Sequence, residues 1–370
     1  MKEIVFLLPQ LKNGGGVRVF VELANILCES ADVTILVPQN SEEGITFNLN
    51  NKVKLISIGR FKETKIQKIR NLFSVIKAAN KKFLNQYIII TDPIMSILSF
   101  FIKGNNVYRF IQADDYRIFD DGLLLKNKWI IRFYKVLTLL SYHDSIKFMF
   151  NSKFSYDSFI KLRGRYSKTA DIPPFHCVHP CINQEIFKPV STIDQKKTLQ
   201  LCLVARKHPA KGLDTFLESW DILKPEIKEQ IEKVILISHD DLSSFNLKDF
   251  EIVNVKDDFE IASVFQTSDI FISTSWMEGF GLPPLEAMAC GCAVITSASQ
   301  GINEYARHQE NCLIYPPRNA FSLADHIASL VNDPNLRSKL VLKGTEDATS
   351  FQWHKSATRF REILEDGNHV

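Results

Sequence analysis

The stretch from Ser275 to Gly291, SWMEGFGLPPLEAMACG, constrains the fold more than any other part of the chain. An apolar run, DIFIST, precedes it, and another, AVIT, follows it. The pattern predicts a strand, a glycine-rich loop, a helix and a second strand. A proline pair suits the first turn of a helix, where an amide lacks a partner anyway, so the helix should begin near Pro283. Glu286 then falls in its first or second turn, and Glu278 lies on the entering loop.

The loop and the first helical turn predict an anion site. Gly279 and Gly281 leave the backbone bare, so amides around Phe280 and Leu282 can approach one spot, and the helix dipole favours negative charge there. The two flanking glutamates suit hydroxyl groups. A sugar attached to a nucleoside diphosphate satisfies both requirements. The alternative is an ordinary loop-to-helix turn with both glutamates solvated.

The block EGFGLPPLEAMACG, with seven residues between Glu278 and Glu286, resembles the E-x7-E signature of family 4 retaining glycosyltransferases. The resemblance implies an α/β chain of the GT-B fold: two Rossmann-like, doubly wound parallel-sheet domains facing across a cleft. It also implies transfer of a sugar from a nucleotide sugar to an acceptor hydroxyl, with retained anomeric configuration. Glu286 would then bind the ribose hydroxyls. Glu278 would bind donor-sugar hydroxyls and stabilise an oxocarbenium-like centre.

A second motif carries the same resemblance. The segment ARKHPAKG is similar to the family's G-R-x4-K-G, with Ala205 in place of the glycine. The resemblance assigns Arg206 and Lys211 to the leaving diphosphate, and fixed cations in a dehydrated site suit that charge. It implies that neither a metal nor another cofactor is needed. The family holds its nucleobase through loop backbone, which falls here at Val255 and Lys256; the alternative for the basic segment is a solvated loop.

The first strand, EIVFLL, leads into a glycine-rich turn that we expect at Gly14 to Gly16 and then into an amphipathic helix. Gly15 and Gly16 leave the backbone open to a phosphate or a sugar. The resemblance implies that they contact the donor diphosphate or the acceptor. The spacing is not G-x-G-x-x-G, and a plain tight turn is the alternative.

Polar residues follow a later predicted strand, VYRFIQADD. The carboxyl ends of parallel strands are where open α/β sheets bind ligands, so we expect Gln112, Asp114 and Asp115 on the acceptor side. Family members often carry a histidine where Gln112 falls. Asp114 or Asp115 would then be an alternative general base, and capping of the next helix is the other role that suits an aspartate there.

The charge is distributed unevenly between two predicted domains. Residues 1–190 hold 27 Lys and Arg against 16 Asp and Glu, whereas the rest of the chain holds 18 against 26. Such asymmetry indicates that the first domain meets an anionic partner. We predict an acceptor-binding domain over 1–190 and a nucleotide-sugar-binding domain over 197–350. The family's last helix, about 351–370 here, would cross back onto the first domain.

Two basic amphipathic segments lie in the first domain. Arg60–Lys82 holds eight Lys or Arg and one acidic residue, and Lys126–Leu140 mixes four cations with Trp129 and Phe133. A solvated basic face for the first segment and a core helix for the second are the simplest interpretations. The alternative is contact with an anionic membrane and a lipid-linked or other glycan acceptor. No nucleic-acid-binding motif is present, so we predict no nucleic acid partner.

Seven cysteines without regular spacing fit reduced thiols, and His176, Cys177, His179 and Cys181 stand too close together for a usual zinc pattern. The N-terminus has the character of a buried strand rather than of a signal peptide. The longest uncharged apolar run is too short to span a bilayer. We therefore expect a cytoplasmic protein, with the inner face of the cell membrane as an alternative location.

The resemblance thus implies a retaining, metal-independent hexosyltransferase, and we expect it to serve bacterial cell-surface polysaccharide or glycoconjugate synthesis. A UDP-sugar is the first choice of donor by family frequency, and GDP- and dTDP-sugars are the alternatives. A non-catalytic sugar-nucleotide-binding scaffold of the same fold is a competing hypothesis. Two departures from the family pattern support it: Gln112 in place of a common histidine, and Cys181 in place of the glycine that usually ends the family's interdomain strand. A transferase that uses a sugar-phosphate acceptor is the other alternative.

Overall fold

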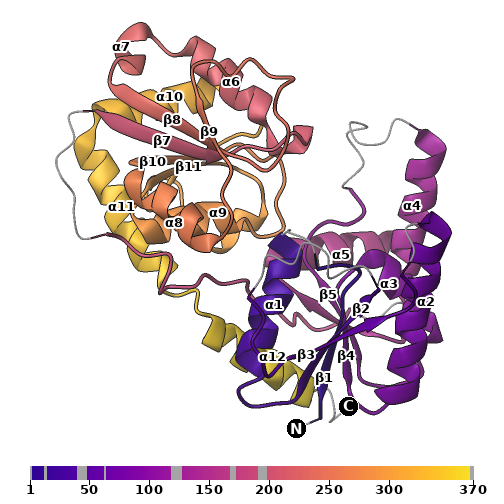
Figure 1. The fold of residues 1–370 in the computed structure, drawn as a ribbon. Helices are drawn as coiled ribbons and strands as arrows, with labels where there is room; N and C mark the ends of the chain where they lie inside the picture. The colour runs from indigo at the N-terminus through magenta and orange to yellow at the C-terminus, as the bar shows by residue number, and fades with distance from the viewer. Residues whose placement is uncertain are drawn as a thin grey trace. The chain divides into compact units, whose positions relative to one another are not determined.

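The computed structural model divides the chain into two compact units (Figure 1). The first unit combines residues 1–180 with residues 353–370, and the second unit comprises residues 181–352. The structure describes residues 2–11, 15–39, 48–61, 64–117, 127–166, 172–190 and 198–366.

The first unit is built on a six-stranded sheet in the order β3-β2-β1-β4-β5-β6, and every neighbouring pair is parallel. The strands β1, β2 and β4 are buried along their whole length, which is the pattern of strands covered on both faces, whereas the edge strand β3 has no buried residue. The strands are β1 Ile4–Leu7, β2 Val33–Pro38, β3 Lys54–Ile58, β4 Tyr87–Ile90, β5 Val107–Ile111 and β6 Lys147–Phe150.

Helices flank both sides of this sheet (Figure 1). α1 packs against α12, the last helix of the chain, while α3 packs against both α2 and α4. The helices are α1 Gly15–Leu27, α2 Lys65–Lys82, α3 Pro93–Leu98, the short 3-10 helix η1 Ser99–Phe101, α4 Lys128–Leu140, α5 Lys153–Tyr166 and α12 Trp353–Asp366.

The second unit repeats this architecture. Its sheet has the order β12-β11-β10-β7-β8-β9 and is again parallel throughout. The strands are β7 Leu199–Val204, β8 Ile231–Ile237, β9 Glu251–Val253, β10 Ile270–Ser273, β11 Ala293–Ser297 and β12 Leu313–Tyr315. The helices are η2 Pro209–Lys211, α6 Leu213–Ile222, α7 Pro225–Lys228, α8 Asp258–Thr267, α9 Leu282–Cys290, η3 Gly301–Glu304, α10 Ala320–Asn332 and α11 Pro334–Ala348.

Each unit has its own hydrophobic core. In the first unit, Phe6 of β1 lies between two aromatic rings, 5.9 Å from the centroid of Phe20 and 5.9 Å from that of Phe360 on α12. In the second unit, strand side chains such as Leu203 and Ile272 pack against Phe216 of α6 in one buried cluster. The last helix therefore belongs to the first unit by its packing, although it follows the second unit in sequence.

Two local predictions are wrong. Gly15 and Gly16 form the first residues of α1 rather than a turn, while Gly14 lies outside the described residues. The segment that contains α4 is not a core helix, because Thr138 is the one residue of α4 that is buried. Apolar periodicity does not distinguish a helix face that is covered from one that is exposed.

Among the described residues, none of the helices combines the length and the hydrophobicity that crossing a bilayer requires.

Candidate active site

The predicted residues of the second unit gather at one edge of its sheet. All six strands run parallel, so their carboxyl ends lie along the same edge. The chain winds outward from β7 to β9 and then outward in the other direction from β10 to β12, so the order reverses between β7 and β10. Such a reversal is where doubly wound sheets bind ligands. Arg206 follows β7 and Glu278 follows β10, which places both at this point.

An ion pair joins the two loops at the reversal. Lys211 Nζ lies 2.6 Å from Glu278 Oε1, and both side chains are partly exposed. Two hydrogen bonds hold the loops together beside this pair. Thr274 Oγ1 donates to the Lys211 carbonyl at 2.6 Å, and the Trp276 amide donates to the Ala210 carbonyl at 2.8 Å. The cation and the carboxylate are thus held in place by the backbone of both loops.

Gly212 allows this close approach of the two loops. Its φ is 69°, in the left-handed region that favours glycine. A Cβ atom at this position would stand 2.2 Å from the Thr274 carbonyl oxygen. The two residues of the lysine-glycine pair thus have different functions. Lys211 supplies the positive charge, and Gly212 leaves room for its loop to approach the loop of Glu278.

The backbone of Glu278 is fixed on the other side. Its amide donates to the Ser299 carbonyl at 2.8 Å, and its carbonyl accepts from the Gly301 amide at 3.1 Å. A Cβ on Gly301 would lie 2.4 Å from the carbonyl carbon of Gly279. The segment after β11 therefore supports the loop that carries Glu278, and only glycine fits at position 301.

The glycine-rich loop leads into α9 as the sequence predicts. Gly281 has a φ of 87°, and no side chain caps the helix. Proline has no amide hydrogen, so only Leu282 and Leu285 can offer amides among the first four residues of α9. The buried Tyr305 hydroxyl donates to the Gly281 carbonyl, and burial raises the pKa of this hydroxyl well above its usual value. Anion binding here would depend on loop amides as much as on the helix.

Glu286 lies in the second turn of α9 and is buried, with 2% of its surface exposed. A carboxylate is almost never fully buried in a folded protein unless it is paired. Cys290 follows one turn later, and burial together with the charge of Glu286 raises the pKa of its thiol to about 12. The glutamate of the second signature position is therefore an interior group rather than a solvated one.

Arg206 has an acidic partner that the sequence does not reveal. Its Nε lies 3.0 Å from Asp240 Oδ2, and the Lys207 amide donates to the same oxygen at 2.7 Å. Burial raises the pKa of Asp240, but the hydrogen bonds from Lys207 and Arg206 outweigh that effect and leave the pKa below its usual value. Asp240 follows β8, so three neighbouring strand ends contribute to the arrangement.

Val255 and Lys256, predicted to hold a nucleobase through their backbone, follow β9 at the end of the same sheet. Val255 is buried and Lys256 is exposed. The Lys256 amide donates to Glu260 Oε2 at 2.7 Å. A ligand that used this amide would have to displace the Glu260 side chain.

In the first unit, the structure brings together two of the predicted residues. Gln112 Nε2 donates to the Gly16 carbonyl at 3.1 Å, which links the end of β5 to the first turn of α1. A Cβ on Gly16 would stand 3.1 Å from the same nitrogen. Gly15 is exposed, with no atom within 4 Å of the position that its Cβ would take. Gly16 and Gln112 are thus joined by a hydrogen bond, and the neighbouring backbone at Gly15 is exposed.

The two aspartates after β5 have different environments. Asp114 is buried and accepts a hydrogen bond from the Arg117 amide at 3.1 Å within a turn, whereas the cap of α4 is Asn127. Asp115 Oδ2 lies 2.6 Å from Nη2 of the buried Arg109. Burial raises the pKa of Asp115, and the Arg109 guanidinium opposes this effect. One oxygen of Asp115 is therefore already occupied by an ion pair within the first unit.

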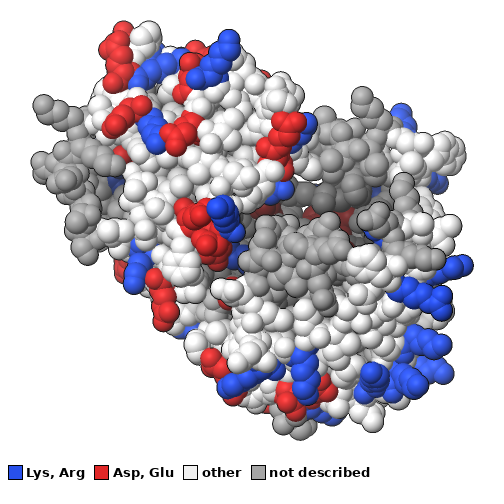
Figure 2. All heavy atoms as spheres, in the orientation of Figure 1, with Lys and Arg blue, Asp and Glu red and all other residues white. Residues whose placement is uncertain are grey.

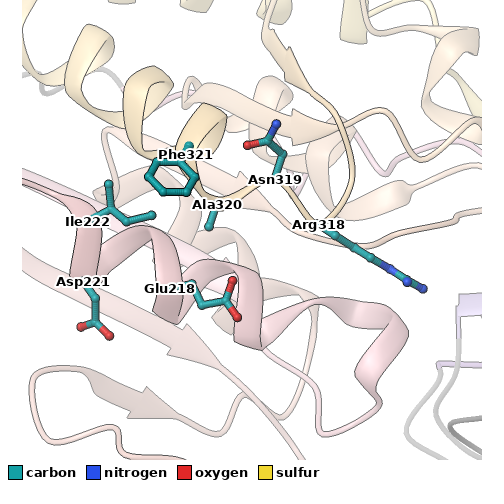
Figure 3. A pocket seen from close by; sticks show the side chains of 7 residues that line it. All are labelled: Glu218, Asp221, Ile222, Arg318, Asn319, Ala320 and Phe321. Carbon is teal, nitrogen blue, oxygen red and sulfur yellow. The ribbon is translucent and has the colours of Figure 1, made fainter.

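A separate pocket in the second unit has a volume of about 510 Å³ (Figure 3). It lies between the later part of α6 and the start of α10, and none of the predicted residues line it. Its lining residues are Glu218, Asp221, Ile222, Arg318, Asn319, Ala320 and Phe321. Arg318 points away from the other lining residues, and its guanidinium carbon lies 3.6 Å from the centre of the Trp276 ring.

Sequence reasoning missed several residues that contact the predicted ones. Among them are Asp240 at Arg206, Thr274 at Lys211, Glu260 at Lys256 and Tyr305 at Gly281. All four stand outside the predicted motifs. A polar residue directly after each predicted strand was the one available signal, and it points to Asp240. No group of three His, Cys, Asp or Glu side chains able to hold a metal occurs within the part of the chain that the structure describes.

Comparison with known proteins finds a family match in the second unit. Residues 183–347 match the family described as glycosyl transferases group 1. This region contains the basic loop after β7, the loop of Glu278 and all of α9. The family match therefore covers the second unit almost entirely and does not extend to the first unit.

Curated relatives match over limited regions. The N,N'-diacetylbacillosaminyl-diphospho-undecaprenol alpha-1,3-N-acetylgalactosaminyltransferase of Campylobacter jejuni is 28% identical over 188 residues, which is 49% of this chain and 48% of that protein. The D-inositol 3-phosphate glycosyltransferase of Thermobispora bispora is 23% identical over 50% of this chain and 49% of that protein. The chain thus aligns with about half the length of these two relatives.

Solved structures match the whole chain. The sucrose-phosphate synthase of Thermosynechococcus elongatus has a TM-score of 0.80 at 15% identity and covers 99% of both chains. Anabaena HepE, solved with UDP and glucose, has a TM-score of 0.74 at 16% identity and covers 99% of this chain and 100% of its own. At such low identity the likeness shows the fold. The predicted fold class, an α/β chain with two parallel-sheet units as in GT-B glycosyltransferases, is confirmed.

Proposed function

We propose that this chain is a retaining glycosyltransferase that moves a hexosyl group from a nucleotide-diphosphate sugar to an acceptor hydroxyl. The observation that carries the proposal is the 2.6 Å pair of Lys211 and Glu278 at the reversal point of the second sheet. This pair lies within the region that matches the group 1 family. It sets a cation for a phosphate beside a carboxylate for sugar hydroxyls.

The predicted residues of the two motifs in the second unit have separate roles in this proposal. Arg206 and Lys211 take the negative charge that grows on the leaving diphosphate, together with amides around Phe280. Glu278 stabilises the positive charge that develops at the anomeric carbon. Glu286 accepts hydrogen bonds from the ribose, a role that suits a carboxylate held inside the unit. Retention would follow from attack on the face that the diphosphate leaves, with a donor phosphate oxygen taking the acceptor proton.

UDP is the first choice of donor nucleotide, with GDP and dTDP as alternatives. The fold-level likeness to HepE, whose structure holds UDP, agrees with this choice. The proposal includes independence of divalent metal, because two fixed cations, Arg206 and Lys211, supply the positive charge that a metal would otherwise supply to the diphosphate.

The proposed acceptor is a lipid-linked glycan, used at the inner face of the membrane in cell-surface glycan synthesis. Two features support it: the excess of Lys and Arg in residues 1–190 and the diphospho-undecaprenol in the name of the Campylobacter relative. A phosphorylated small acceptor is the second candidate, because the Thermobispora relative is named for D-inositol 3-phosphate. Both acceptors are anionic, and they differ in whether a lipid is required.

The test is turnover by the full chain with UDP-, GDP- and dTDP-hexoses, offered with an undecaprenyl-diphosphate glycan in detergent or with inositol phosphate in buffer. We expect nucleoside diphosphate release with one donor and one acceptor, and an axial or equatorial product linkage, read by NMR, that matches the donor. An inverted product would contradict the retaining mechanism. Nucleotide binding without release for any pair would favour the non-catalytic scaffold.

A further inference from the structure

Helix α4 of the first unit exposes side chains that a soluble protein normally covers. Trp129 is 77% exposed and Phe133 is 64% exposed, and Ile130 and Leu140 are also open to solvent. Thr138 is the one buried residue of the helix. A surface helix ordinarily turns its apolar stripe toward the core. In α4 one side packs against α3, and Trp129 and Phe133 lie outside that contact, open to solvent.

Helix α2 and the short helix η1 extend this apolar surface. Ile66 and Ile69 of α2 are exposed, and so is Phe73, whose ring lies 6.2 Å from that of Phe101. α3 packs against both α2 and α4, and Figure 1 shows all three helices on one side of the sheet. We call this surface the α2–α4 face; its exposed apolar residues are Ile66, Ile69, Phe73, Phe100, Phe101, Trp129, Ile130 and Phe133.

The same face is strongly basic. Neither α2 nor α4 contains an Asp or a Glu. Lys and Arg side chains gather on the side of the first unit where α2 runs (Figure 2). Those that are exposed on α2, the loop after η1 and α4 are Lys68, Arg70, Lys77, Lys81, Lys82, Lys103, Lys128 and Arg132.

The combination of positive charge and exposed apolar side chains indicates which kind of partner can bind to the α2–α4 face. A second copy of this face would bring two cationic surfaces together, which costs free energy. A nucleic acid would neutralise the charge, but it would leave isoleucine and phenylalanine side chains without an apolar environment. An anionic bilayer offers phosphate headgroups for the cations and acyl chains for the apolar groups, and an amphipathic tryptophan such as Trp129 suits the boundary between them.

We propose that the α2–α4 face docks on an anionic lipid bilayer, with Trp129 and Phe133 inserted at the boundary between headgroups and acyl chains. The lysines and arginines of α2 lie against the headgroups. Attraction to anionic headgroups and burial of apolar area act together in such a contact, so each contribution alone gives weaker binding. This docking goes beyond the proposed reaction, because it would bring the enzyme to a lipid-linked acceptor whatever the donor is.

The test is co-sedimentation of the full chain with vesicles at about 0.15 M salt. Vesicles of phosphatidylethanolamine with phosphatidylglycerol present the anionic surface, and vesicles of phosphatidylcholine alone serve as the neutral reference. We expect binding to the first kind and at least tenfold weaker binding to the second. Equal binding to both kinds, or binding to neither, would overturn the proposal.

Variants locate the surface. Trp129→Ser combined with Phe133→Ser should weaken binding to anionic vesicles at least tenfold, and Lys68→Gln combined with Arg70→Gln should also weaken it. Phe321→Ser combined with Leu342→Ser is the matched control, because both side chains are highly exposed in the second unit. The control should bind as wild type does. Binding unchanged in the α4 variant would overturn the proposal.

Three further measurements exclude contact through another surface, dimer formation and misfolding of the variants. Tryptophan emission should shift to shorter wavelength on vesicle addition, and Trp129→Phe should remove most of this shift. Sedimentation equilibrium should show the same oligomeric state for wild type and the α4 variant; a dimer that only wild type forms would assign the face to a second copy and contradict the proposal. Nucleotide-dependent melting, measured without vesicles, confirms that each variant is folded, and its result bears on the proposed reaction alone.

Discussion

Glu278 is the residue on which the proposed chemistry depends most. It is partly exposed, ion-paired with Lys211, and fixed through its own amide and carbonyl. Such a group is held in place before a substrate arrives, which is the condition under which an electrostatic contribution to catalysis is large. A mutation of this carboxylate should therefore affect turnover more than binding or stability.

We expect Glu278→Gln to lower kcat by about 100- to 1000-fold, because the amide cannot stabilise positive charge at the anomeric carbon. Nucleotide affinity should stay within a few-fold of wild type, since Lys211 and Arg206 remain. Glu365→Gln, at an exposed position on α12, is the matched control and should change neither quantity. Steady-state kinetics and calorimetric nucleotide binding measure the two effects. Unchanged kcat in Glu278→Gln would contradict the assignment.

Asp240 gives a pH dependence with a defined sign. Its pKa is lowered in the folded protein by the hydrogen bonds from Lys207 and Arg206, which outweigh its burial. A lowered pKa means that the carboxylate stabilises the fold above its usual value of 3.8, and this contribution is lost as the pH falls. The difference in free energy of unfolding between wild type and Asp240→Asn should therefore be constant from about pH 7 to about pH 5 and shrink toward about pH 3. Urea unfolding across this range tests it, and a difference that grows on acidification would contradict it.

At the scale of elements, the loop after β10 and the segment after β11 support each other through Gly301. Gly301→Ala places a Cβ 2.4 Å from the carbonyl carbon of Gly279, so the loop of Glu278 must move. We expect a loss of roughly 2–4 kcal/mol in the free energy of unfolding. Gly15→Ala is the control: its Cβ would meet no atom within 4 Å, and it should be neutral or stabilise by at most about 1 kcal/mol. Chemical denaturation of both variants measures the contrast, and equal effects would contradict it.

The last helix stabilises the first unit. Phe360 is fully buried on α12 and lies against Phe6 of β1. Phe360→Ala should lower the free energy of unfolding by about 3–5 kcal/mol, because it removes a buried ring and leaves a cavity. Phe321→Ala, which removes an exposed ring, should cost little. If both variants unfolded alike, the packing of α12 on this unit would be in doubt.

The sequence predicts the elements of this chain well where a local pattern fixes them. The buried strands, the start of α9 at the proline pair and the basic loop after β7 all follow from apolar runs and from residues with restricted backbones. Failures occur where a distant contact decides. Asp240 reaches Arg206 from the end of another strand, and Trp129 and Phe133 of α4 are exposed although they lie in an apolar pattern. Neither feature can be read from the spacing of residues.

At the scale of the whole molecule, two parallel-sheet units divide the work that the account proposes. The second unit carries the paired charges and the region that matches the group 1 family. The first unit carries the basic, apolar α2–α4 face. The two roles are separable, since nucleotide binding needs no membrane and membrane docking needs no nucleotide.

The central claim is that the second unit binds a nucleoside diphosphate without a metal. It is tested most directly by thermal unfolding of the purified chain with UDP, GDP and dTDP, each with EDTA and again with Mg²⁺. We predict that one nucleotide, at about 100 times its dissociation constant, stabilises the protein by roughly 2.7 kcal/mol in EDTA, and that Mg²⁺ adds little. A Lys211→Met variant should lose most of this shift. No shift with any nucleotide in folded protein, or a shift that requires Mg²⁺, would contradict the account.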